Sequence, residues 1–311
     1  MNRYITIDGG TTNTRVCLVE DKKIVDSVKF SNGETVSVEG RKAYADAIRD
    51  AIKQILQKNS LAEADICRIL ASGSTITSEF GLYPLEHAVV PVGIETLKQT
   101  AVEVTLAEIT SIPFVFVRGV KTACNALEDA DMMRGEEAEL IGLLREGGDS
   151  CAYLLMGSHT KIVRTDSVGN ITDIRTMLTG ELAQSVAQNT ILKHSFSLAE
   201  AKLEKEHLIE GYLYCREHGV SEALFKARVL KNIFGASEDA AYSFYMGVIL
   251  CGDVENTCKL KPSKAVVGGN KKLKDAICIL LESCTKIPTE KLSAKEVEAA
   301  VPMGLIKIYE Y

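Results

Sequence analysis

Apolar and polar residues alternate so that the first part of the chain divides into short strands and one long helix. Tyr4–Ile7 and Val16–Val19 are apolar, β-prone runs separated by a polar stretch, a pattern that predicts a β-hairpin. A third strand is predicted from Ile24 to Phe30. Residues 41–58 carry apolar side chains at helical spacing. A buried strand is predicted from Ile66 to Ala71, so the chain opens with three strands, a helix and a further strand.

The middle of the chain continues with a polar loop, residues 72–81, directly after this buried strand. The pattern then predicts a helix over residues 94–108 and a strand from Phe114 to Val117. A second helix is predicted to begin after Arg134-Gly135, because the apolar residues between Leu140 and Leu144 would face a core.

The second half of the chain repeats the plan of the N-terminus. A strand at Cys151–Met156 and a turn at Gly157–Thr160 lead into a second strand. A further strand is predicted at Ile171–Met177, with a helix that starts near Thr179. This repetition predicts an α/β protein of two similar domains whose hairpin turns face each other across a cleft.

The remaining segments would complete the second domain. Residues 198–250 have helical spacing and mixed charge, and they contain no motif. Ala265–Gly269 predicts a strand that ends in a diglycine turn and leads into a helix. The last helix, residues 294–308 with Pro302 inside it or at its start, is expected to return to the first domain.

The composition agrees with two folded domains. The 311 residues are 46% hydrophobic and 25% charged, enough to bury two cores. We expect domains at residues 1–145 and 146–293, with residues 294–311 as a terminal helix packed on the first. Lys plus Arg is 36 against 42 for Asp plus Glu. The resulting net charge of -6 argues against nucleic acid as a partner.

Nine cysteines are scattered along the chain without a Cys-x-x-Cys pair. The odd count and the apolar surroundings of Cys17 and Cys151 favour reduced thiols in a cytoplasmic protein, and we expect no zinc site. No basic-then-apolar leader precedes the first strand, and no apolar run approaches about eighteen residues, so we expect no membrane segment. The expected partners are small molecules, and a homodimer is left open.

The turn of the first hairpin has the residue types of a phosphate site. Its two glycines let backbone N–H groups approach an anion, and the hydroxyl and amide side chains that follow add donors. Asp8, at the end of the strand, can hold Mg²⁺ through its water shell. An ordinary hairpin turn would explain Asp-Gly-Gly alone. The candidate nucleotide-binding residues here are Gly10, Thr11, Thr12 and Asn13.

The loop after the buried strand is a candidate substrate loop. Ligands of open α/β sheets bind at the carboxyl ends of strands, and this loop begins at such an end. Its candidate substrate-binding residues are Ser72, Gly73 and Ser74. A surface connection without chemical use is the alternative.

The segment before the second helix supplies candidate catalytic residues. Glu136 and Glu137 would lie in the first helical turn, near the positive end of the helix dipole. Asp131 and Arg134 precede them in the same segment. The alternative is that the two glutamates lie at a helix N-terminus without a catalytic role, which is common.

The turn in the second half offers a second candidate phosphate-binding set, made of Gly157, Ser158, His159 and Thr160. Lys161 follows as a candidate for an anionic substrate. His159 alone would more often be structural, and Lys161 alone a surface charge. Gly268 and Gly269 have the usual setting of an adenosine-binding turn, although a plain strand–helix connection explains them almost as well.

These segments resemble those of known proteins. The first turn resembles the phosphate-1 loop of the sugar kinase, actin and heat-shock-70 superfamily, and the element order resembles its ribonuclease-H-like (actin-like ATPase) domain. The glutamate segment is similar to the catalytic segment of exopolyphosphatase-like members. Together the segments resemble one family, 2-dehydro-3-deoxygalactonokinase. The residues that carry this resemblance are Asp8 to Arg15, Met133 to Glu137, Gly157 to Lys161 and Thr176 to Leu182. The chain departs from the family where Met156 replaces Pro and Ile162 replaces Trp, which bears on the identity of the sugar acid.

The resemblance implies two ribonuclease-H-like domains and transfer of the γ-phosphoryl group of Mg-ATP to the 6-hydroxyl of 2-dehydro-3-deoxygalactonate. It implies that Asp8 holds the metal, that the two turns hold the phosphates, and that Glu136 is the general base. Asp131 and Glu137 are alternative bases. The candidates for the substrate carboxylate or the transferring phosphate are Arg15, Arg134 and Lys161.

Three other functions stay open. A kinase of a related keto-deoxy sugar acid would use the same residues. A phosphohydrolase of the exopolyphosphatase kind would release phosphate without a sugar acceptor. A non-catalytic nucleotide sensor would bind ATP without either reaction, and the carboxylates of Asp8 and Glu136 argue against it.

Overall fold

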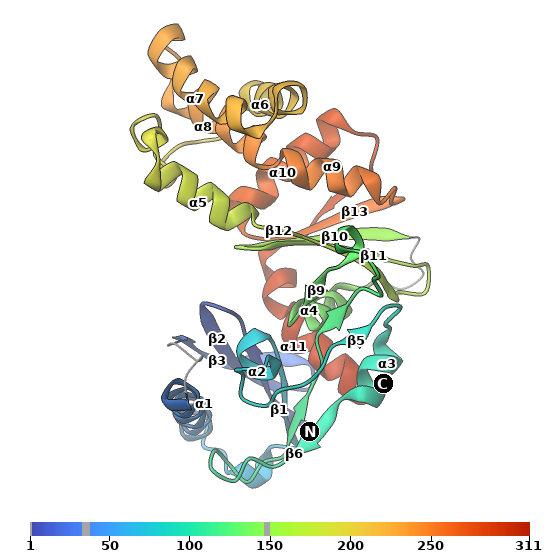
Figure 1. Cartoon of the computed structure of the whole chain (residues 1–311). Helices are drawn as coiled ribbons and strands as arrows, with labels where there is room; N and C mark the ends of the chain where they lie inside the picture. Colours follow the sequence, from blue (N-terminus) through green and yellow to red (C-terminus); the bar gives the residue numbers. More distant parts are fainter. Residues whose placement is uncertain (1, 33–37, 146–149) are drawn as a thin grey trace. The chain divides into compact units, whose positions relative to one another are not determined.

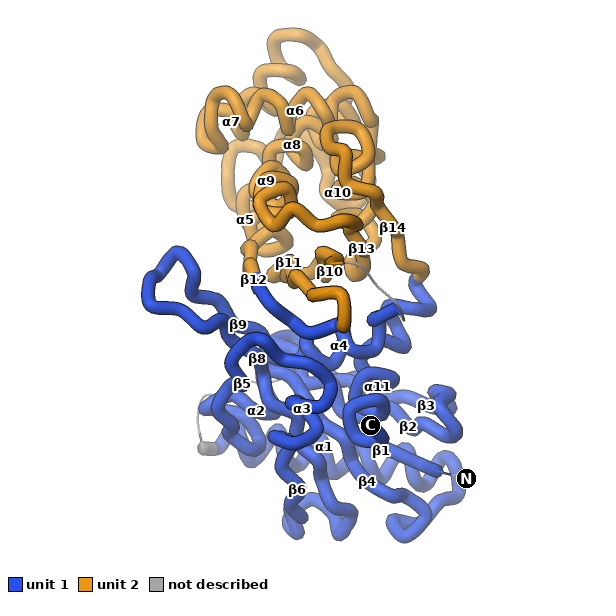
Figure 2. The backbone as a smooth tube through the Cα atoms, turned by 90° about the vertical axis from the view of Figure 1, so that its right-hand side faces the viewer, with its two compact units in different colours: residues 1–147, 169–174, 294–311 blue, residues 148–168, 175–293 orange. Residues whose placement is uncertain are grey.

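The computed structural model describes residues 2–32, 38–145 and 150–311, and it divides the chain into two compact units (Figures 1 and 2). Unit 1 consists of residues 1–147, 169–174 and 294–311, and unit 2 of residues 148–168 and 175–293. The segment 169–174, which the sequence pattern places in the second domain, groups with unit 1. Backbone hydrogen bonds join this segment to unit 1, because Val92 and Ile171 form a β-bridge with N–H···O distances of 3.1 and 2.8 Å.

The main sheet of unit 1 has six strands in the order β3-β2-β1-β4-β7-β6. The strands are β1 (Arg3–Gly9), β2 (Asn13–Glu20), β3 (Lys23–Ser31), β4 (Arg68–Ser72), β6 (Val102–Val104) and β7 (Phe114–Phe116). The first three are antiparallel, β4 runs parallel to β1, and β7 runs parallel to β4. Asp8 and Ser72 are paired in register, so the ends of β1 and β4 lie side by side.

Helices α1 (Val38–Lys58) and α11 (Ala294–Glu310) cover opposite faces of this sheet. Side chains of a strand alternate between faces, and Ile5 and Ile7 of β1 join the core that contains the apolar side chains of α1. The other face carries Tyr4, whose ring packs edge-on against Tyr309 of α11 at 5.7 Å. Asp8 shares this second face, and a cavity of about 50 Å³ lies between it and α11.

Helix α4 (Glu136–Leu143) packs against α11 at very short range. A Cβ at Gly142 would come within 1.9 Å of the Ala300 carbonyl oxygen, and a Cβ at Gly304 within 1.8 Å of the Ala138 carbonyl oxygen. Only glycine permits this approach at the two positions. The terminal helix therefore holds the helix that begins with Glu136 and Glu137.

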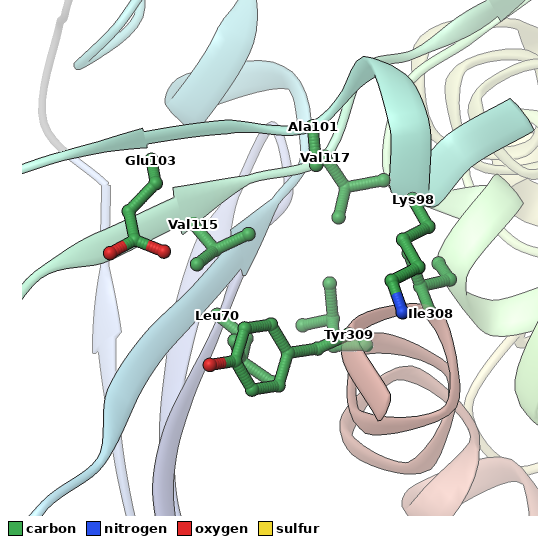
Figure 3. Close-up of a pocket in the computed structure, with 9 residues that line it drawn as sticks. Leu70, Lys98, Ala101, Glu103, Val115, Val117, Ile308 and Tyr309 are labelled. Carbon is green, nitrogen blue, oxygen red and sulfur yellow. The ribbon is translucent and has the colours of Figure 1, made fainter. Parts of the chain in front are cut away.

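A second, larger cavity of unit 1, of about 160 Å³, lies beside the C-terminal end of α11 (Figure 3). Its walls are mainly apolar and include Leu70, Val115 and Ile308. Helix α3 (Ile94–Thr100) contributes Lys98. This cavity is lined by residues other than those considered for chemistry above.

The predicted helix over residues 94–108 is wrong beyond Thr100. Helix α3 ends there, and Val102–Val104 forms the edge strand β6, antiparallel to β7. Alternating Val-Glu-Val suits a strand at the edge of a sheet. A neighbouring strand thus decides the conformation of a segment whose own pattern is ambiguous.

Unit 1 also contains small elements that the sequence pattern did not predict. A three-stranded sheet is formed by β5 (Ala88–Val89), β8 (Val120–Lys121) and β9 (Met132–Met133), in the order β5-β8-β9. Helix α2 (Ser74–Thr77) lies in the candidate substrate loop. Strands of two residues are too short for periodicity to reveal.

Unit 2 is built on a five-stranded sheet in the order β12-β11-β10-β13-β14, although residues 171–174 of β12 group with unit 1. The strands are β10 (Cys151–Met156), β11 (Thr160–Thr165), β12 (Ile171–Met177), β13 (Lys264–Gly269) and β14 (Thr289–Lys291). The helices are α5 (Thr179–Asn189), α6 (Lys205–His218), α7 (Val220–Phe234), α8 (Glu238–Ile249), α9 (Cys251–Lys259) and α10 (Lys271–Cys284). The core is rich in aromatic side chains, among them Tyr212, Phe244 and Tyr245.

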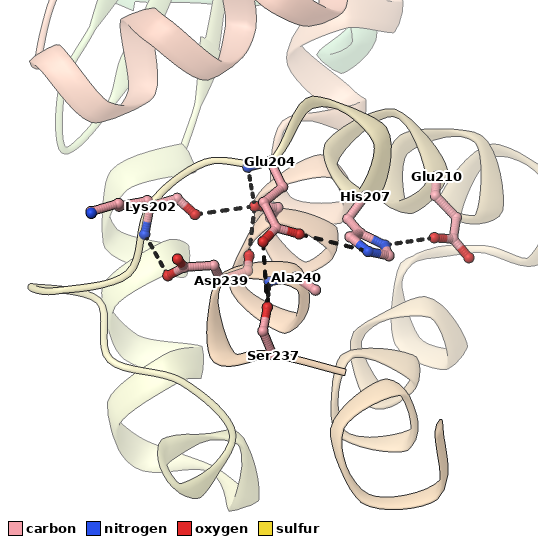
Figure 4. A network of polar contacts seen from close by, with 8 residues as sticks. Lys202, Glu204, His207, Glu210, Ser237, Asp239 and Ala240 are labelled. Carbon is pink, nitrogen blue, oxygen red and sulfur yellow. Dashed lines mark hydrogen bonds and ion pairs between the residues drawn. The ribbon is translucent and has the colours of Figure 1, made fainter. Parts of the chain in front are cut away.

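A serine cap fixes the start of α8, and polar contacts link the segment before α6 to α8 in unit 2 (Figure 4). The Ser237 hydroxyl accepts a hydrogen bond from the Ala240 N–H at 3.0 Å, the usual arrangement of a serine N-cap. The Lys202 N–H donates to the Asp239 carboxylate at 2.8 Å, and the Glu204 N–H donates to the Ser243 hydroxyl at 2.7 Å. These bonds tie the segment before α6 to α8.

The two main sheets share one plan. In each, a hairpin (β1–β2 or β10–β11) pairs through its first strand with a later parallel strand, β4 or β13, which pairs in turn with another parallel strand. This matches the repeated strand pattern of the sequence. The fold is therefore α/β with mixed sheets. In the part of the chain that the structure describes, no helix combines the length and apolar character needed to cross a bilayer.

Candidate active site

Three loops of unit 1 meet beside the end of β1. A Cβ at Gly73 would come within 2.3 Å of the Gly9 carbonyl oxygen. A Cβ at Gly135 would lie 3.2 Å from the Gly73 Cα and 4.0 Å from the Asp8 carboxylate. Gly73 and Gly135 have φ angles of +116° and +106°, which other residues rarely adopt. The structure thus brings together the first turn, the start of the substrate loop and the start of α4.

A backbone hydrogen bond closes the first turn, and Asn32 forms further hydrogen bonds to it. The Gly10 N–H donates to the Asn13 carbonyl oxygen at 3.1 Å. Asn32 donates from its backbone N–H to the Thr12 carbonyl at 2.9 Å and from its side chain to the Gly10 carbonyl at 2.5 Å. Thr11 and Thr12 are exposed at the tip. Their hydroxyl groups are therefore available to a ligand.

Three hydroxyl groups form a hydrogen-bonded chain next to this turn. The Tyr44 hydroxyl, buried on α1, lies 2.7 Å from the Thr14 hydroxyl and 2.7 Å from the Thr75 hydroxyl. Thr14 also donates to the Asn32 side-chain carbonyl at 2.6 Å. The chain links the hairpin to α1 and to the substrate loop. Neither Tyr44 nor Asn32 is revealed as a site residue by the sequence pattern.

The Asp8 carboxyl group, at the end of β1, lies near a second negative charge. Burial, and next the negative charge of Glu136, raise the pKa of its carboxyl group to about 6. The positive charges of Arg15 and Lys29 act in the opposite direction. Lys29 pairs with Arg15 across the β2–β3 ladder and is exposed. It is a further cation near Asp8 that the sequence motifs do not reveal.

The two glutamates at the start of α4 differ in their surroundings. Glu137 is fully buried, and its two carboxylate oxygens accept hydrogen bonds from the Gly135 N–H at 2.9 and 2.8 Å. Burial, followed by the charge of Glu136, raises the pKa of Glu137 to about 8. Glu136 is partly exposed and accepts a hydrogen bond from the Arg134 N–H at 3.0 Å. Glu137 therefore caps its own helix, whereas Glu136 is accessible.

Glu139 is a third acidic residue of this region, in addition to the candidates predicted from the sequence. Burial raises the pKa of its carboxyl group to about 8, with smaller contributions from the charges of Asp8 and Glu136. Its position three residues after Glu136 places both on one face of α4. That spacing is the signal by which the sequence could have revealed it.

Arg134 holds the substrate loop in place. Its guanidinium group donates to the Thr77 carbonyl at 2.6 Å, the Thr77 hydroxyl at 3.0 Å and the Leu85 carbonyl at 2.8 Å, and it contacts His87 Nδ1 at 3.3 Å. Asp131 lies just before β9, and its carboxylate accepts a hydrogen bond from the Met132 N–H at 2.7 Å.

The other substrate-binding candidates of unit 1 are also engaged or buried. Arg15 donates to the Glu298 carbonyl at 2.9 Å and forms an ion pair with its carboxylate at 2.8 Å, which anchors α11 to β2. Ser72 is fully buried, and the Ser74 hydroxyl lies 3.4 Å from the Gly9 carbonyl oxygen.

In unit 2, the turn Gly157–Thr160 packs against the start of α5. The Gly180 and Glu181 N–H groups donate to the Ser158 carbonyl at 3.0 and 3.1 Å. A Cβ at Gly180 would come within 2.3 Å of the Gly157 carbonyl oxygen. His159 lies 3.3 Å from the Glu181 carboxylate. The predicted second turn and the Thr-Gly-Glu-Leu segment therefore form one local structure.

A buried carboxyl group lies beneath this local structure. Asp253 of α9 is 1% exposed and accepts hydrogen bonds from the Thr179 hydroxyl at 2.8 and 2.9 Å. The Thr160 hydroxyl is a further partner, and burial raises the pKa of Asp253 to about 7. Lys161 is buried as well, and its ammonium group donates to the Thr176 hydroxyl at 2.8 Å.

The diglycine turn lies at the end of β13, next to β10. Gly269 has a φ of +91°, and a Cβ there would come within 2.1 Å of the Met156 carbonyl oxygen. The same carbonyl accepts the Asn270 N–H at 2.7 Å, and the Asn270 side chain caps α10. Gly268 and Gly269 are thus adjacent to the residue that precedes Gly157.

A family model described as 2-keto-3-deoxy-galactonokinase matches residues 8–308 of this chain. The chain belongs to the 2-keto-3-deoxy-galactonokinase family. The predicted family and enzyme class are confirmed, since its members are carbohydrate kinases. ATP use follows from the same membership.

Individual relatives agree with the kinase family. The chain is 24% identical over 257 residues to the 2-dehydro-3-deoxygalactonokinase of Escherichia coli (strain K12), which covers 81% of this chain and 79% of the relative. It is 37% identical over 71 residues, 22% of this chain and 23% of the relative, to a protein of Rhizobium meliloti (strain 1021) named as a probable 2-dehydro-3-deoxygalactonokinase.

Solved structures share the fold of this chain. A crystal structure described as a putative 2-dehydro-3-deoxygalactonokinase from Sinorhizobium meliloti superposes with a TM-score of 0.75 at 19% identity, over 98% of this chain and 97% of that one. The activator of the 2-hydroxyisocaproyl-CoA dehydratase from Clostridium difficile, solved with bound ADPNP, has a TM-score of 0.51 at 11% identity, over 99% and 95% of the two chains. At these identities the likeness concerns the fold alone.

The metal of a kinase has one candidate ligand at the first turn. Within residues 2–32, 38–145 and 150–311, no three His, Cys, Asp or Glu side chains are grouped closely enough to hold a metal ion together. Asp8 is the carboxylate at the strand end next to the phosphate-type turn. A metal there would therefore take most of its ligands from water or substrate.

Proposed function

We propose that the protein transfers the γ-phosphoryl group of ATP to the 6-hydroxyl of 2-dehydro-3-deoxygalactonate, producing the 6-phosphate and ADP. The observation that carries the proposal is the meeting of three loops at Gly9, Gly73 and Gly135 in a member of this kinase family. One loop has the donors of a phosphate site, one follows a strand end, and one begins with an accessible glutamate.

The first turn and the second turn are proposed to hold the nucleotide. Gly10, Thr11, Thr12 and Asn13 in unit 1 offer backbone N–H groups and exposed side chains to phosphate oxygens. Gly157, Ser158, His159 and Thr160 are the corresponding residues of unit 2. Gly268 and Gly269, at the end of β13, are proposed to lie against the adenosine. Their lack of side chains permits a close approach of the ligand to the backbone.

Mg²⁺ belongs to this proposal, and the residues around Asp8 fit it. Burial and the charge of Glu136 disfavour the ionised form of Asp8, and an added cation would offset both effects. Mg²⁺ usually keeps several waters and takes one or two carboxylates together with substrate phosphates. When bound, the ion neutralises negative charge on the phosphate oxygens.

Glu136 is the proposed general base. It would accept the proton of the 6-hydroxyl as that oxygen bonds to the γ-phosphorus and the bond from the γ-phosphorus to the bridging oxygen of ADP breaks. Glu136 is partly exposed, whereas Glu137 is buried and bonded to the Gly135 N–H. These differences favour Glu136 over Glu137. Asp131 is the alternative base outside α4, and its carboxylate accepts the Met132 N–H at 2.7 Å.

The sugar acid is proposed to bind at the loop Ser72–Ser74. Its carboxylate requires a cation, and Arg15, Arg134 and Lys161 were the candidates. Arg134 already donates to the substrate loop, so we propose that it shapes the loop. Lys29 joins the candidates because it is exposed and acts electrostatically on Asp8.

The architecture is part of the proposal. We propose that each unit has the ribonuclease-H-like plan, which the common strand order of the two sheets supports. A homodimer and a cytoplasmic location stay predictions from the sequence.

The position of phosphorylation can be tested by analysis of the product. The wild-type protein is incubated with Mg-ATP and 2-dehydro-3-deoxygalactonate, and the product is examined by ³¹P and ¹³C NMR. The proposal predicts a phosphomonoester whose phosphorus couples to C6. An analogue that lacks the 6-hydroxyl should bind but accept no phosphate. A phosphate on another carbon would refute the 6-position while leaving the kinase family unaffected.

A further inference from the structure

Asp253 is buried at the point where two segments of unit 2 meet. Its carboxyl group accepts hydrogen bonds from the hydroxyl of Thr179, the first residue of α5, at 2.8 and 2.9 Å. The Thr160 hydroxyl, at the end of the candidate phosphate turn, also lowers the pKa of Asp253 as a hydrogen-bond donor, and it lies 4.0 Å from the Met156 sulfur. Both threonines are buried, and Asp253 is 1% exposed. One side chain of α9 therefore connects the turn to the helix that packs on it.

The backbone contacts between the same segments leave little freedom. The Ser158 carbonyl oxygen accepts two N–H groups, from Gly180 at 3.0 Å and from Glu181 at 3.1 Å. A Cβ at Gly180 would come within 2.3 Å of the Gly157 carbonyl oxygen. The carbonyl groups of the turn are thus directed toward α5. The position of α5 consequently determines the arrangement of the turn.

Packing alone does not explain why the carboxyl group of Asp253 is buried. A buried carboxyl group is costly unless hydrogen bonds satisfy it, and an apolar side chain would fill the same place without that cost. Among the described residues, no ion pair of Asp253 with a cation is found, and its hydrogen-bond partners are the Thr179 and Thr160 hydroxyls and its own backbone N–H.

We propose that Asp253 is a positioning residue for the ATP phosphates, which acts by holding Thr160 and Thr179 so that the turn Gly157–Thr160 keeps its binding geometry. This inference rests on the proposed function, because it assumes that this turn contacts the nucleotide. Asp253 itself lies beneath the turn and touches no substrate.

Four variants separate positioning from general stability. Asp253→Ala removes both hydrogen bonds, and Asp253→Asn keeps an acceptor of the same shape. Thr179→Val removes one hydroxyl partner with little change in volume. Asp275→Asn is the control, because Asp275 is an acidic residue of α10 in the same unit, with ion pairs to Lys271 and Lys291 at 2.6 Å.

The experiment measures binding of the non-hydrolysable analogue AMPPNP by calorimetry, and KM for ATP and for the sugar acid by an ADP-release assay. Asp253→Ala should raise the Kd of AMPPNP and the KM for ATP about tenfold, as expected for the loss of one or two hydrogen bonds. The KM for the sugar acid should stay unchanged. Thr179→Val should show a smaller change in the same direction, and Asp253→Asn and Asp275→Asn should bind like the wild type.

Amide hydrogen exchange without nucleotide gives an independent result. Asp253→Ala should speed exchange at Gly180 and Glu181, whose N–H groups bond to the turn. If Asp253→Ala does not fold, Thr179→Val carries the same test with its fold intact. Unchanged AMPPNP binding and unchanged exchange in Thr179→Val, or an equal rise of both KM values, would refute the role of Asp253. A wild-type protein that binds no AMPPNP would instead refute the proposed function.

Discussion

Gly73 lies so close to Gly9 that a Cβ at position 73 would come within 2.3 Å of the Gly9 carbonyl oxygen. Unit 2 contains the same relationship, since a Cβ at Gly269 would come within 2.1 Å of the Met156 carbonyl oxygen. In both units, a glycine with positive φ at the end of a parallel strand contacts the end of the first strand. Each candidate nucleotide-binding turn thus begins beside a glycine that permits close backbone approach.

Substitution of Gly73 by alanine should therefore damage both stability and activity. Gly73→Ala combines an unfavourable φ with a backbone clash, and it should lower the free energy of unfolding by more than about 2 kcal/mol. Gly235→Ala is the matched control, because Gly235 also has a positive φ but no atom within 4 Å of its added Cβ. That control should cost about 1 kcal/mol and keep activity. Equal effects of both variants in denaturant unfolding would show that the contact with Gly9 is unimportant.

The two glutamates at the start of α4 should respond differently to substitution. Glu136→Gln should lower kcat by ~10²–10⁴-fold, the usual contribution of a general base, with ATP still bound. Glu137→Gln should reduce kcat much less, because this side chain is buried and bonded to the Gly135 N–H. Steady-state kinetics of both variants decide the assignment. Near-normal turnover in Glu136→Gln would remove it as the base.

The hydroxyl group of Tyr44 should contribute to the order of the first turn. Tyr44→Phe removes its contacts with the Thr14 and Thr75 hydroxyls and should lower the free energy of unfolding by about 1 kcal/mol. It should also raise the KM for ATP, because Thr14 and Thr75 connect the turn to α1 and to the substrate loop. Tyr83→Phe, which leaves this hydroxyl chain intact, serves as the control. A Tyr44→Phe variant with unchanged KM for ATP would show that the chain does not order the turn.

Asp253 should make stability depend on pH. Its pKa of about 7 in the folded protein exceeds its ordinary value of 3.8, so between these values the folded state binds more protons than the unfolded state. The free energy of unfolding should then fall as pH rises from about 4 to 7, by at most about 1.4 kcal/mol per pH unit from this group. Denaturant unfolding of the wild type and of Asp253→Asn at several pH values measures the difference. A difference that stays constant with pH, or grows in favour of the wild type, would contradict the burial effect.

Much of the fold could be predicted because local patterns agree with tertiary structure. The hairpin turn after Asp8 appears where the pattern places it, and the strand predicted from Ile66 to Ala71 appears as Arg68–Ser72. The helix predicted over residues 94–108 fails because pairing with β7 turns Val102–Val104 into a strand. Such a pairing joins residues distant in sequence, and local periodicity carries no information about it.

The residues of the candidate site also divide into those that the sequence reveals and those that only the structure reveals. Residues beside glycines, such as Asp8 and Glu136, could be chosen because the turn chemistry marks them. Tyr44 occupies an apolar helical position, and Asp253 lies in a helix of mixed charge, so neither differs in sequence from an ordinary core or surface residue. Their roles arise from hydroxyl and carboxyl contacts over 30 to 93 residues of chain, which only the structure supplies.

The measurement that tests the central claim most directly is a coupled ADP-release assay of the wild-type protein with Mg-ATP. The acceptors compared are 2-dehydro-3-deoxygalactonate, 2-dehydro-3-deoxygluconate, related aldonates and none. We predict turnover that requires a keto-deoxy acid and is fastest with 2-dehydro-3-deoxygalactonate. Phosphate release without an acceptor, or no ADP release with any acid tested, would contradict the assignment of the three converging loops to sugar-acid phosphorylation.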